Sequence, residues 1–212
     1  MTKDHVSSII QKLKELYPIV ACELRHENAY ELLFATRLSA QCTDKRVNEI
    51  TKILFSRYPT LSSIANCDLK ELEAIVRPCG VYKMKAKNIR ESANILLSSY
   101  GGMVPDTMEE LLGLPGVGRK TANLILGDIF NQSAIIADTH CIRLSNRLGL
   151  CKTKDPVRVE FSLKKIIAPQ EQRDFSHRLV RHGRAVCNAR SPHCADCVLS
   201  PECAFYKFSF CK

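Results

Sequence analysis

A glycine turn followed by a lysine gives residues 114–123 the clearest chemical potential in the sequence. The run reads Leu-Pro-Gly-Val-Gly-Arg-Lys-Thr-Ala-Asn, and its glycines leave backbone N–H groups with little side chain around them. A helical pattern follows, so these groups precede a helix N-terminus, where anions bind favourably. Lys120 lies in the first turn of that helix, although the helix dipole disfavours cations there. This unfavourable placement predicts that the Lys120 amine has a binding or catalytic role. In an ordinary turn between helices, the lysine would only be a solvated surface charge.

A carboxylate stands at the start of another predicted helix. Asp138 opens the run Asp-Thr-His-Cys-Ile-Arg, where an aspartate commonly accepts a backbone N–H as the helix N-cap. One helix and a short extended piece separate it from Lys120, which is enough chain for the two side chains to face each other. A plain capping role and a chemical role both fit this position.

Cysteines are abundant, with eleven among 212 residues. No export signal accompanies them, so a disulfide framework is not expected, and most of the scattered ones fit buried free thiols. Four lie within seventeen residues in the form C-x6-C-x2-C-x5-C: Cys187, Cys194, Cys197 and Cys203. Four such thiolates in a reducing compartment predict a metal site. Zinc usually takes two close pairs, and only one is present here; the wider gaps favour an iron–sulfur cluster and leave zinc open.

These motifs resemble those of the endonuclease III family of DNA glycosylases. The glycine turn is similar to the helix–hairpin–helix of that family, and the cysteine spacing is similar to its [4Fe–4S] loop. The resemblance runs from about Leu32 to Cys203. It implies two helical domains with a DNA cleft between them, one at roughly 22–132 and the other combining 1–21 with 133–212.

The resemblance also implies a reaction. In enzymes of this family the residues that match Lys120 and Asp138 are the catalytic pair. Departure of a damaged base gives C1′ of its sugar oxocarbenium character, which a nearby carboxylate stabilises. A neutral lysine amine, favoured by the helix N-terminus and by Arg119, attacks C1′ and forms a Schiff base. β-Elimination then breaks the strand 3′ to the lesion. The implied enzyme removes oxidised pyrimidines and cleaves abasic sites.

DNA contacts follow from the same resemblance. The target base must leave the helical stack. Gln41 matches the wedge glutamine of the family, and Val81, which is shorter and stiffer than leucine, stands where a leucine wedge is common. His140 matches a histidine near the DNA backbone. Further contacts are expected from the hairpin residues Pro115, Gly116, Val117, Gly118 and Arg119.

Charge supports a nucleic-acid partner. The formal net charge is +9 and the isoelectric point is about 9.0, which favours a polyanion. The basic residues that fit phosphate binding form two stretches: Lys83, Lys85, Lys87 and Arg90, then Arg181, Arg184 and Arg190. Since Ser191 occupies a position that is often basic in the family, contact there depends on Arg190. The expected partner is double-stranded DNA that contains damaged bases or abasic sites.

Helical periodicity covers most of the chain. The predicted helices are residues 3–17, 28–40, 44–57, 68–76, 85–99, 106–113, 119–130 and 138–148. Thr107 and Glu110 have the spacing of a capping box, and Gly149 is expected to end the last helix. The closest candidate for a strand, residues 133–137, is short and does not alternate cleanly. The predicted fold class is therefore all-α.

The N-terminal residues form an amphipathic stripe and not a signal peptide. No run approaches the ~18 apolar residues that span a bilayer. We therefore expect a monomer without membrane association, located in the cytoplasm, or in the nucleus if the host is a eukaryote.

Two other functions remain open. A monofunctional adenine glycosylase of the same superfamily lacks the hairpin lysine and has a glutamate near position 37, where this chain has Arg37 in an otherwise apolar helix. A non-enzymatic helix–hairpin–helix module would bind DNA without chemistry at Lys120. Cross-linking to abasic DNA discriminates, because only the bifunctional enzyme forms an imine with its substrate.

Overall fold

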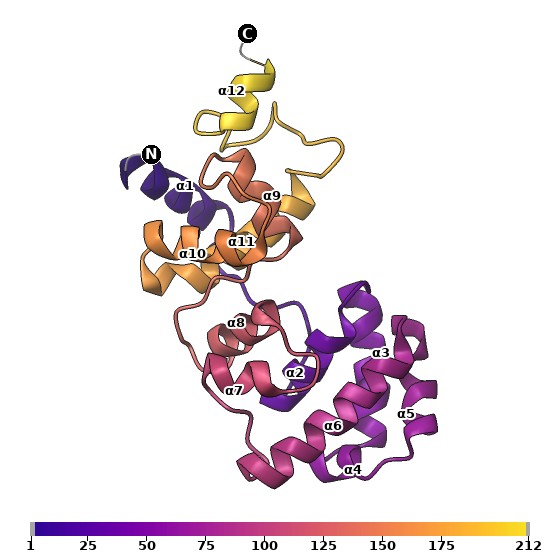
Figure 1. Ribbon diagram of the computed structural model, residues 1–212. Coiled ribbons are helices and arrows are strands. Elements are labelled where there is room, and N and C mark those ends of the chain that lie inside the picture. The colour runs from indigo at the N-terminus through magenta and orange to yellow at the C-terminus, as the bar shows by residue number, and fades with distance from the viewer. Residues whose placement is uncertain (1–2, 211–212) are drawn as a thin grey trace. The chain divides into compact units, whose positions relative to one another are not determined.

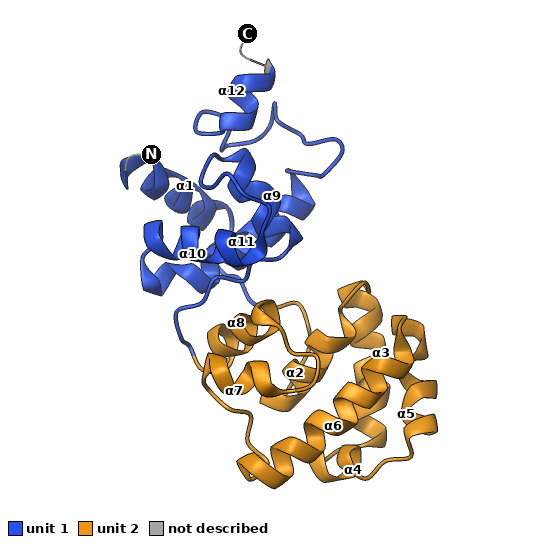
Figure 2. Cartoon of the chain, in the orientation of Figure 1, with its two compact units in different colours: residues 1–21, 131–212 blue, residues 22–130 orange. Residues whose placement is uncertain are grey.

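The computed structural model describes residues 3–210, and every regular element in that range is helical (Figure 1). The predicted all-α class is confirmed, and residues 133–137 lie outside any helix or strand. The chain divides into two compact units, Cys22–Phe130 and Met1–Ala21 with Asn131–Lys212 (Figure 2). The domains expected from the sequence place one boundary two residues later, after residue 132. No described helix is long and apolar enough to cross a bilayer.

The unit of residues 22–130 contains the glycine turn. Its helices are α2 (Ala29–Leu38), α3 (Asp44–Arg57), α4 (Leu61–Ala65), α5 (Leu69–Val76), α6 (Tyr82–Tyr100), α7 (Met108–Gly113) and α8 (Arg119–Asp128), with a 3-10 turn η1 (Arg77–Cys79). The long helix α6 packs on α4 and α5, and α2 packs on α3 and α8.

Side-chain caps define where these helices begin. Each cap accepts a hydrogen bond from the backbone N–H three residues on, and the caps are Asn28, Thr43, Thr60, Asp68 and Thr107. Replacing one such cap by alanine typically costs about 1 kcal/mol. Thr107 accepts from the Glu110 N–H at 3.3 Å, while its hydroxyl donates to the Glu110 carboxylate at 2.6 Å. Thr107 therefore caps α7 as predicted, but its hydroxyl takes the Glu110 carboxylate that a capping box would place on the Thr107 backbone N–H.

Helix α2 is the buried axis of this unit. Leu32, Leu33, Phe34 and Leu38 are fully buried, and each such side chain contributes roughly 1.5–3 kcal/mol by leaving water. The helix ends at Leu38, short of the predicted residue 40. It ends early because the chain turns sharply at Gln41, whose φ is 57°.

The second unit joins both ends of the chain in one core. It contains α1 (Lys3–Leu16), α9 (Thr139–Arg147), α10 (Pro156–Ile166), η2 (Pro169–Glu171), α11 (Gln172–Ala185) and α12 (Ala204–Phe210). Ile9 and Leu13 of α1 are fully buried in the same core as Leu144, Phe175 and Leu179. Gly149 follows the C-cap of α9 with φ of 80°, as predicted. This core fixes α9, which carries Asp138 at its start.

Candidate active site

The glycine turn joins α7 to α8 in a tight hairpin. The Val117 N–H donates to the Leu114 carbonyl at 3.0 Å. Gly116 has φ of 71°, a left-handed conformation that glycine adopts without a steric penalty. Gly118 is the N-cap of α8 and supplies no side-chain cap. No side chain caps the first N–H groups of α8, which leaves them suited to an anion, as the sequence predicts.

Two polar side chains lie directly against this hairpin. A Cβ added to Gly116 would stand 2.0 Å from Nη2 of Arg37 and 2.4 Å from Nδ2 of Asn88. Only glycine leaves room for these groups. Arg37 is half-buried, burial lowers the pKa of its guanidinium, and its Nε is buried without a hydrogen-bond partner. The arginine that looked misplaced in an apolar helix therefore reaches the hairpin with its charged end.

Lys120 is the second residue of α8, and its side chain is exposed. The seven residues that follow it, 121–127, are buried, so packing anchors the helix while its N-terminal end remains accessible. Arg119 precedes the lysine, and no acidic residue lies in the first turn. The amine thus stands at a helix N-terminus, next to N–H groups that attract a phosphate.

Asp138 is held at the start of α9. Its Oδ1 accepts the Cys141 N–H at 2.7 Å, which makes it the N-cap. The segment before it is extended and buried, and the Ile136 N–H donates to Oγ of Ser176 at 3.1 Å. The capping role predicted for Asp138 is confirmed. Asp138 and Lys120 belong to different units of the fold.

Gln41 and Val81 share an unusual backbone conformation. Gln41 has φ of 57°, and Val81 has φ of 48° and ψ of 33°. The left-handed region is strained for a β-branched residue, at a cost of about 1–3 kcal/mol. Both side chains are exposed, and Val81 is 64% accessible to solvent. The fold therefore tolerates strain in order to present these two residues.

One residue of the predicted phosphate-binding stretch is buried and not exposed. Lys85 is buried, and its ammonium donates to three backbone carbonyls. A phosphate cannot reach it, so that prediction was wrong for Lys85, whereas Lys83 and Lys87 are exposed. In the second stretch the exposed side chains are Arg181, Arg184 and Arg190.

His140 lies where α9 packs closely on α11. Its Nδ1 is 3.1 Å from Nη2 of Arg143, which also donates to the Gly183 carbonyl at 3.0 Å. A Cβ at Gly183 would approach the His140 ring nitrogen to 2.6 Å. The glycine therefore allows the close contact that orients the histidine.

The four clustered cysteines gather in the loop between α11 and α12. Burial raises the pKa of the Cys194 and Cys197 thiols, and the neighbouring Cys187 and Cys203 thiols raise both further. Among residues 3–210, no group of three His, Cys, Asp or Glu side chains that could hold a metal ion is found. A cube of iron and sulfide takes one thiolate per iron and needs wider spacing than tetrahedral zinc. The C-x6-C-x2-C-x5-C spacing in the sequence, with only one close pair, therefore remains the argument for a cluster over a zinc ion.

Hydrogen-bond donors surround these sulfur atoms. Nη1 of Arg147 lies 3.2 Å from Sγ of Cys187 and also donates to the Asn188 carbonyl at 2.7 Å. Burial lowers the pKa of His182 to about 4, so its ring is neutral. Its Nδ1 is 3.2 Å from the Tyr17 hydroxyl and its Nε2 is 3.3 Å from Sγ of Cys197. If the hydroxyl donates to Nδ1, the Nε2–H donates to the sulfur. Such donors are the outer-shell contacts that stabilise thiolate ligands.

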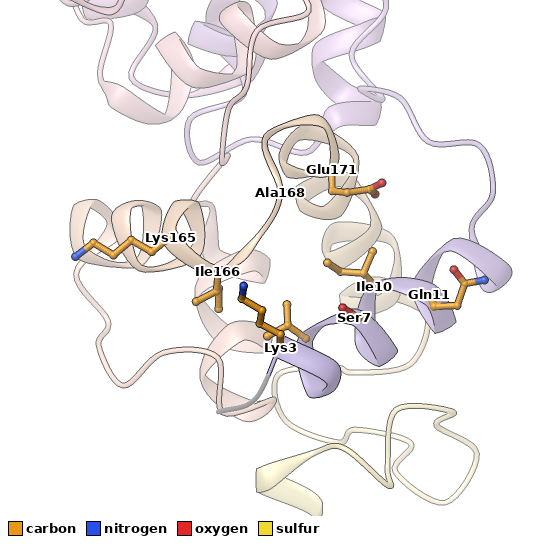
Figure 3. A pocket seen from close by; sticks show the side chains of 9 residues that line it. Lys3, Ser7, Ile10, Gln11, Lys165, Ile166, Ala168 and Glu171 are labelled. Atoms are coloured by element: carbon orange, nitrogen blue, oxygen red, sulfur yellow. The ribbon is translucent and has the colours of Figure 1, made fainter.

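A separate groove of about 470 Å³ lies in the unit that contains α1 (Figure 3). Ile10 and Ile166 supply apolar lining, and Lys3, Lys165 and Glu171 supply charges of both signs. None of the residues predicted for the active site lines this groove. Its mixed charge does not suit a polyanion, so we assign it no part in the chemistry.

Comparison with known proteins identifies the family. Residues 34–169 match the model of the HhH-GPD superfamily of base excision DNA repair proteins. The chain is 46% identical to endonuclease III of Synechocystis sp. over 95% of this chain and 92% of that protein. It is 36% identical to endonuclease III of Escherichia coli K12 over 97% of each.

Solved structures give the same result. A non-covalent endonuclease III–DNA complex matches with a TM-score of 0.94 and 42% identity over the full length of both chains. A trapped endonuclease III–DNA covalent intermediate matches with a TM-score of 0.93 and 42% identity over 98% of each. Since the sequence and the fold agree over almost the whole chain, this protein belongs to the endonuclease III family of base excision DNA repair enzymes.

Proposed function

We propose that this enzyme is a bifunctional DNA glycosylase and abasic-site lyase that acts on oxidised pyrimidines in double-stranded DNA. The observation that carries the proposal is the exposed Lys120 amine at the N-terminus of α8, directly after an uncapped glycine hairpin. The hairpin N–H groups bind a backbone phosphate. That contact brings the adjacent sugar to the amine.

Lys120 is the nucleophile in this scheme. Its neutral amine attacks C1′ of the damaged nucleotide, the bond from C1′ to the base breaks, and the base leaves with a proton. The sugar ring opens to an iminium that links C1′ to the lysine nitrogen. Loss of a C2′ proton then expels the 3′ phosphate by β-elimination, which cleaves the strand.

Asp138 has two tasks in the proposal. Its Oδ1 caps α9, and the carboxylate charge stabilises the sugar as positive charge develops at C1′. The buried segment before Asp138 limits how far the carboxylate can move.

Base extrusion is assigned to Gln41 and Val81. A flipped base leaves a gap in the duplex, and both residues stand exposed on strained turns of one unit. His140 and Arg190 are assigned to the DNA backbone. The hairpin residues assigned to it are Pro115, Gly116, Val117, Gly118 and Arg119.

The cofactor that we propose is a [4Fe–4S] cluster held by Cys187, Cys194, Cys197 and Cys203. The spacing of the four cysteines in the sequence and the Arg147 guanidinium 3.2 Å from Sγ of Cys187 support this assignment. When bound, the cluster ties the loop to the core on which α9 and α11 pack, and its binding energy contributes to folding. The expected cytoplasmic location and monomeric state stay predictions from the sequence.

Two assays test the proposal together. Borohydride should trap the protein on an abasic-site duplex, because it reduces the iminium to a stable amine. Base release should be faster from a duplex with an oxidised pyrimidine than from one with adenine opposite 8-oxoguanine. Trapping without release of any pyrimidine would restrict the enzyme to lyase activity. Binding with neither activity would favour the non-enzymatic module.

A further inference from the structure

The turns that carry Gln41 and Val81 come from distant parts of the chain and lie beside each other in one unit. Gln41 follows the end of α2, and Val81 lies between η1 and α6. Both residues are left-handed and exposed. The left-handed region is uncommon for residues other than glycine, and it is least favourable for the β-branched Val81. A contact from elsewhere in the unit would help to hold both turns.

Lys85 supplies that contact. Its Nζ donates to the Leu38 carbonyl at 2.9 Å, to the Ala40 carbonyl at 2.7 Å and to the Cys79 carbonyl at 2.7 Å. Two of these carbonyls belong to the turn that precedes Gln41, and the third lies two residues before Val81. One ammonium group therefore joins both turns.

The chemistry of this contact suits a lysine. An ammonium has three N–H donors, and all three are used here on carbonyl oxygens. The Leu38 carbonyl is at the C-terminal end of α2, where the helix dipole favours a cation. The side chain is only 4% exposed, so loss of the ammonium would leave buried carbonyls without donors, at about 1–3 kcal/mol each.

A second link joins the same turns. Cys42 directly follows Gln41, and the Cys79 thiol interacts with the Cys42 thiol. Burial, and after it the Cys42 thiol, raise the pKa of Cys79 to about 11, while the Lys85 ammonium acts to lower it. The Cys42 and Cys79 thiols therefore form a second contact between the two turns, beside the Lys85 ammonium.

We propose that Lys85 is a positioning residue that locks the Gln41 and Val81 turns together, so that both side chains enter the duplex as one wedge. This inference rests on the proposed function, which assigns base extrusion to these two residues. Lys85 itself touches neither DNA nor the reacting sugar. A displacement of about 1 Å can cost on the order of 10²-fold in rate, so a loosened wedge should impair duplex substrates severely.

A comparison of double-stranded and single-stranded substrates tests this role. A single-stranded abasic oligonucleotide needs Lys120 but no wedge, whereas a duplex with an oxidised pyrimidine needs both. Lys85→Met should slow base release from the duplex by about tenfold to 100-fold. Its rate of borohydride trapping on the single-stranded oligonucleotide should stay within about twofold of the rate of the parent. Lys70→Met, on exposed α5 surface in the same unit, is the matched control and should match the parent on both substrates.

A fluorescence measurement reports the wedge without catalysis. 2-Aminopurine opposite a tetrahydrofuran abasic analogue brightens when a wedge unstacks it. The parent should raise its emission on binding, and Lys85→Met should raise it much less at saturating protein. Equal losses on duplex and single strand, or an unchanged duplex rate with full emission, would overturn the proposal.

Two more variants keep the result decisive. Lys85→Arg retains the charge and N–H donors, and its defect should again be confined to the duplex but smaller. If Lys85→Met does not fold, the same criteria apply to Lys85→Arg. Gln41→Ala tests the underlying assignment: if it leaves duplex release and emission unchanged, the wedge role itself fails, independently of Lys85.

Discussion

Several single residues in this enzyme occupy places that stability alone would disfavour. Val81 is β-branched in the left-handed region, Lys85 buries an ammonium, and Lys120 puts a cation at a helix N-terminus. The left-handed Val81 costs about 1–3 kcal/mol, the cation at the start of α8 costs about 0.3–1 kcal/mol, and the buried ammonium of Lys85 is tolerated only because it is hydrogen-bonded. All three lie in the unit that contains the hairpin, at or beside residues to which we assign contacts with DNA. Strain of this kind is common at functional sites.

Val81 offers a direct test of this view. Val81→Gly removes a β-branched side chain from a left-handed residue, and the side chain is mostly exposed, so little burial is lost. The free energy of unfolding should not fall and should rise by up to about 1 kcal/mol. Base release from a duplex should slow, because the wedge loses its side chain. Urea unfolding and single-turnover release measure the two effects, and a variant both less stable and equally active would contradict the assignment.

At the scale of elements, the hairpin depends on the absence of a side chain. Gly116 combines a positive φ with close approach of Arg37 and Asn88. This contact joins α2, α6 and the turn before α8. The position of the hairpin N–H groups, to which we assign a phosphate, therefore depends on side chains from two other helices.

Gly116→Ala should expose this dependence. An alanine there meets the left-handed penalty of about 1–2 kcal/mol, and its Cβ pushes the Arg37 guanidinium away. We expect lower stability and weaker DNA binding. Arg37→Leu in the same chain should recover part of the stability loss, because it removes the nearest clashing group. Additive effects in this double-mutant cycle would argue against the contact.

The cysteine loop predicts a second element-scale result. Cys197→Ser should lower iron content and soluble yield, because a bound cluster contributes folding energy. Cys22→Ser, a single thiol outside the loop, should leave the iron content unchanged. Brown colour, visible absorption and metal analysis of anaerobically purified protein measure the cluster. Stoichiometric zinc without iron in the parent would contradict the iron–sulfur assignment.

Sequence patterns predicted the elements whose buried face is apolar. Residues 44–57 form the predicted helix without a shift, and α7 and α8 flank the glycine turn as expected. Helix α11 was not predicted from its pattern because its buried face is largely polar, including Gln172, His177 and Arg178. Helix α10 was missed although Asp155 and Pro156 are standard start signals.

The site was predictable only in part. Lys120, Asp138 and the cysteine loop are recognisable from local sequence. The role of Lys85 is not, because lysine is rarely buried and its three acceptors are backbone atoms of other segments. Arg37 is similar, since its neighbour Gly116 is distant in the sequence. Long-range contacts of polar groups carry no periodic signal.

The whole molecule combines two helical units with an excess of positive charge. The formal net charge is +9, and exposed basic residues occur in both units, such as Lys83 and Arg181. The N- and C-terminal segments share one core, so a cut at either end should disturb the unit that carries Asp138.

Salt should weaken DNA binding strongly. If about six to ten phosphates are contacted, affinity should fall on the order of 10³–10⁵-fold between roughly 50 and 200 mM salt. Fluorescence anisotropy with an undamaged duplex measures this slope, because the electrostatic contribution is independent of sequence. A flat response would contradict a phosphate-based interface.

The central claim is that the Lys120 amine is the nucleophile, and borohydride trapping of Lys120→Gln on an abasic-site duplex tests it most directly. The variant keeps a polar side chain and removes a cation from a helix N-terminus, so its stability should not fall. It should bind the duplex but neither cross-link nor cleave it. Lys70→Gln should trap as the parent does. If Lys120→Gln cross-links and cleaves as fast as the parent, the nucleophile lies elsewhere and the mechanism is wrong.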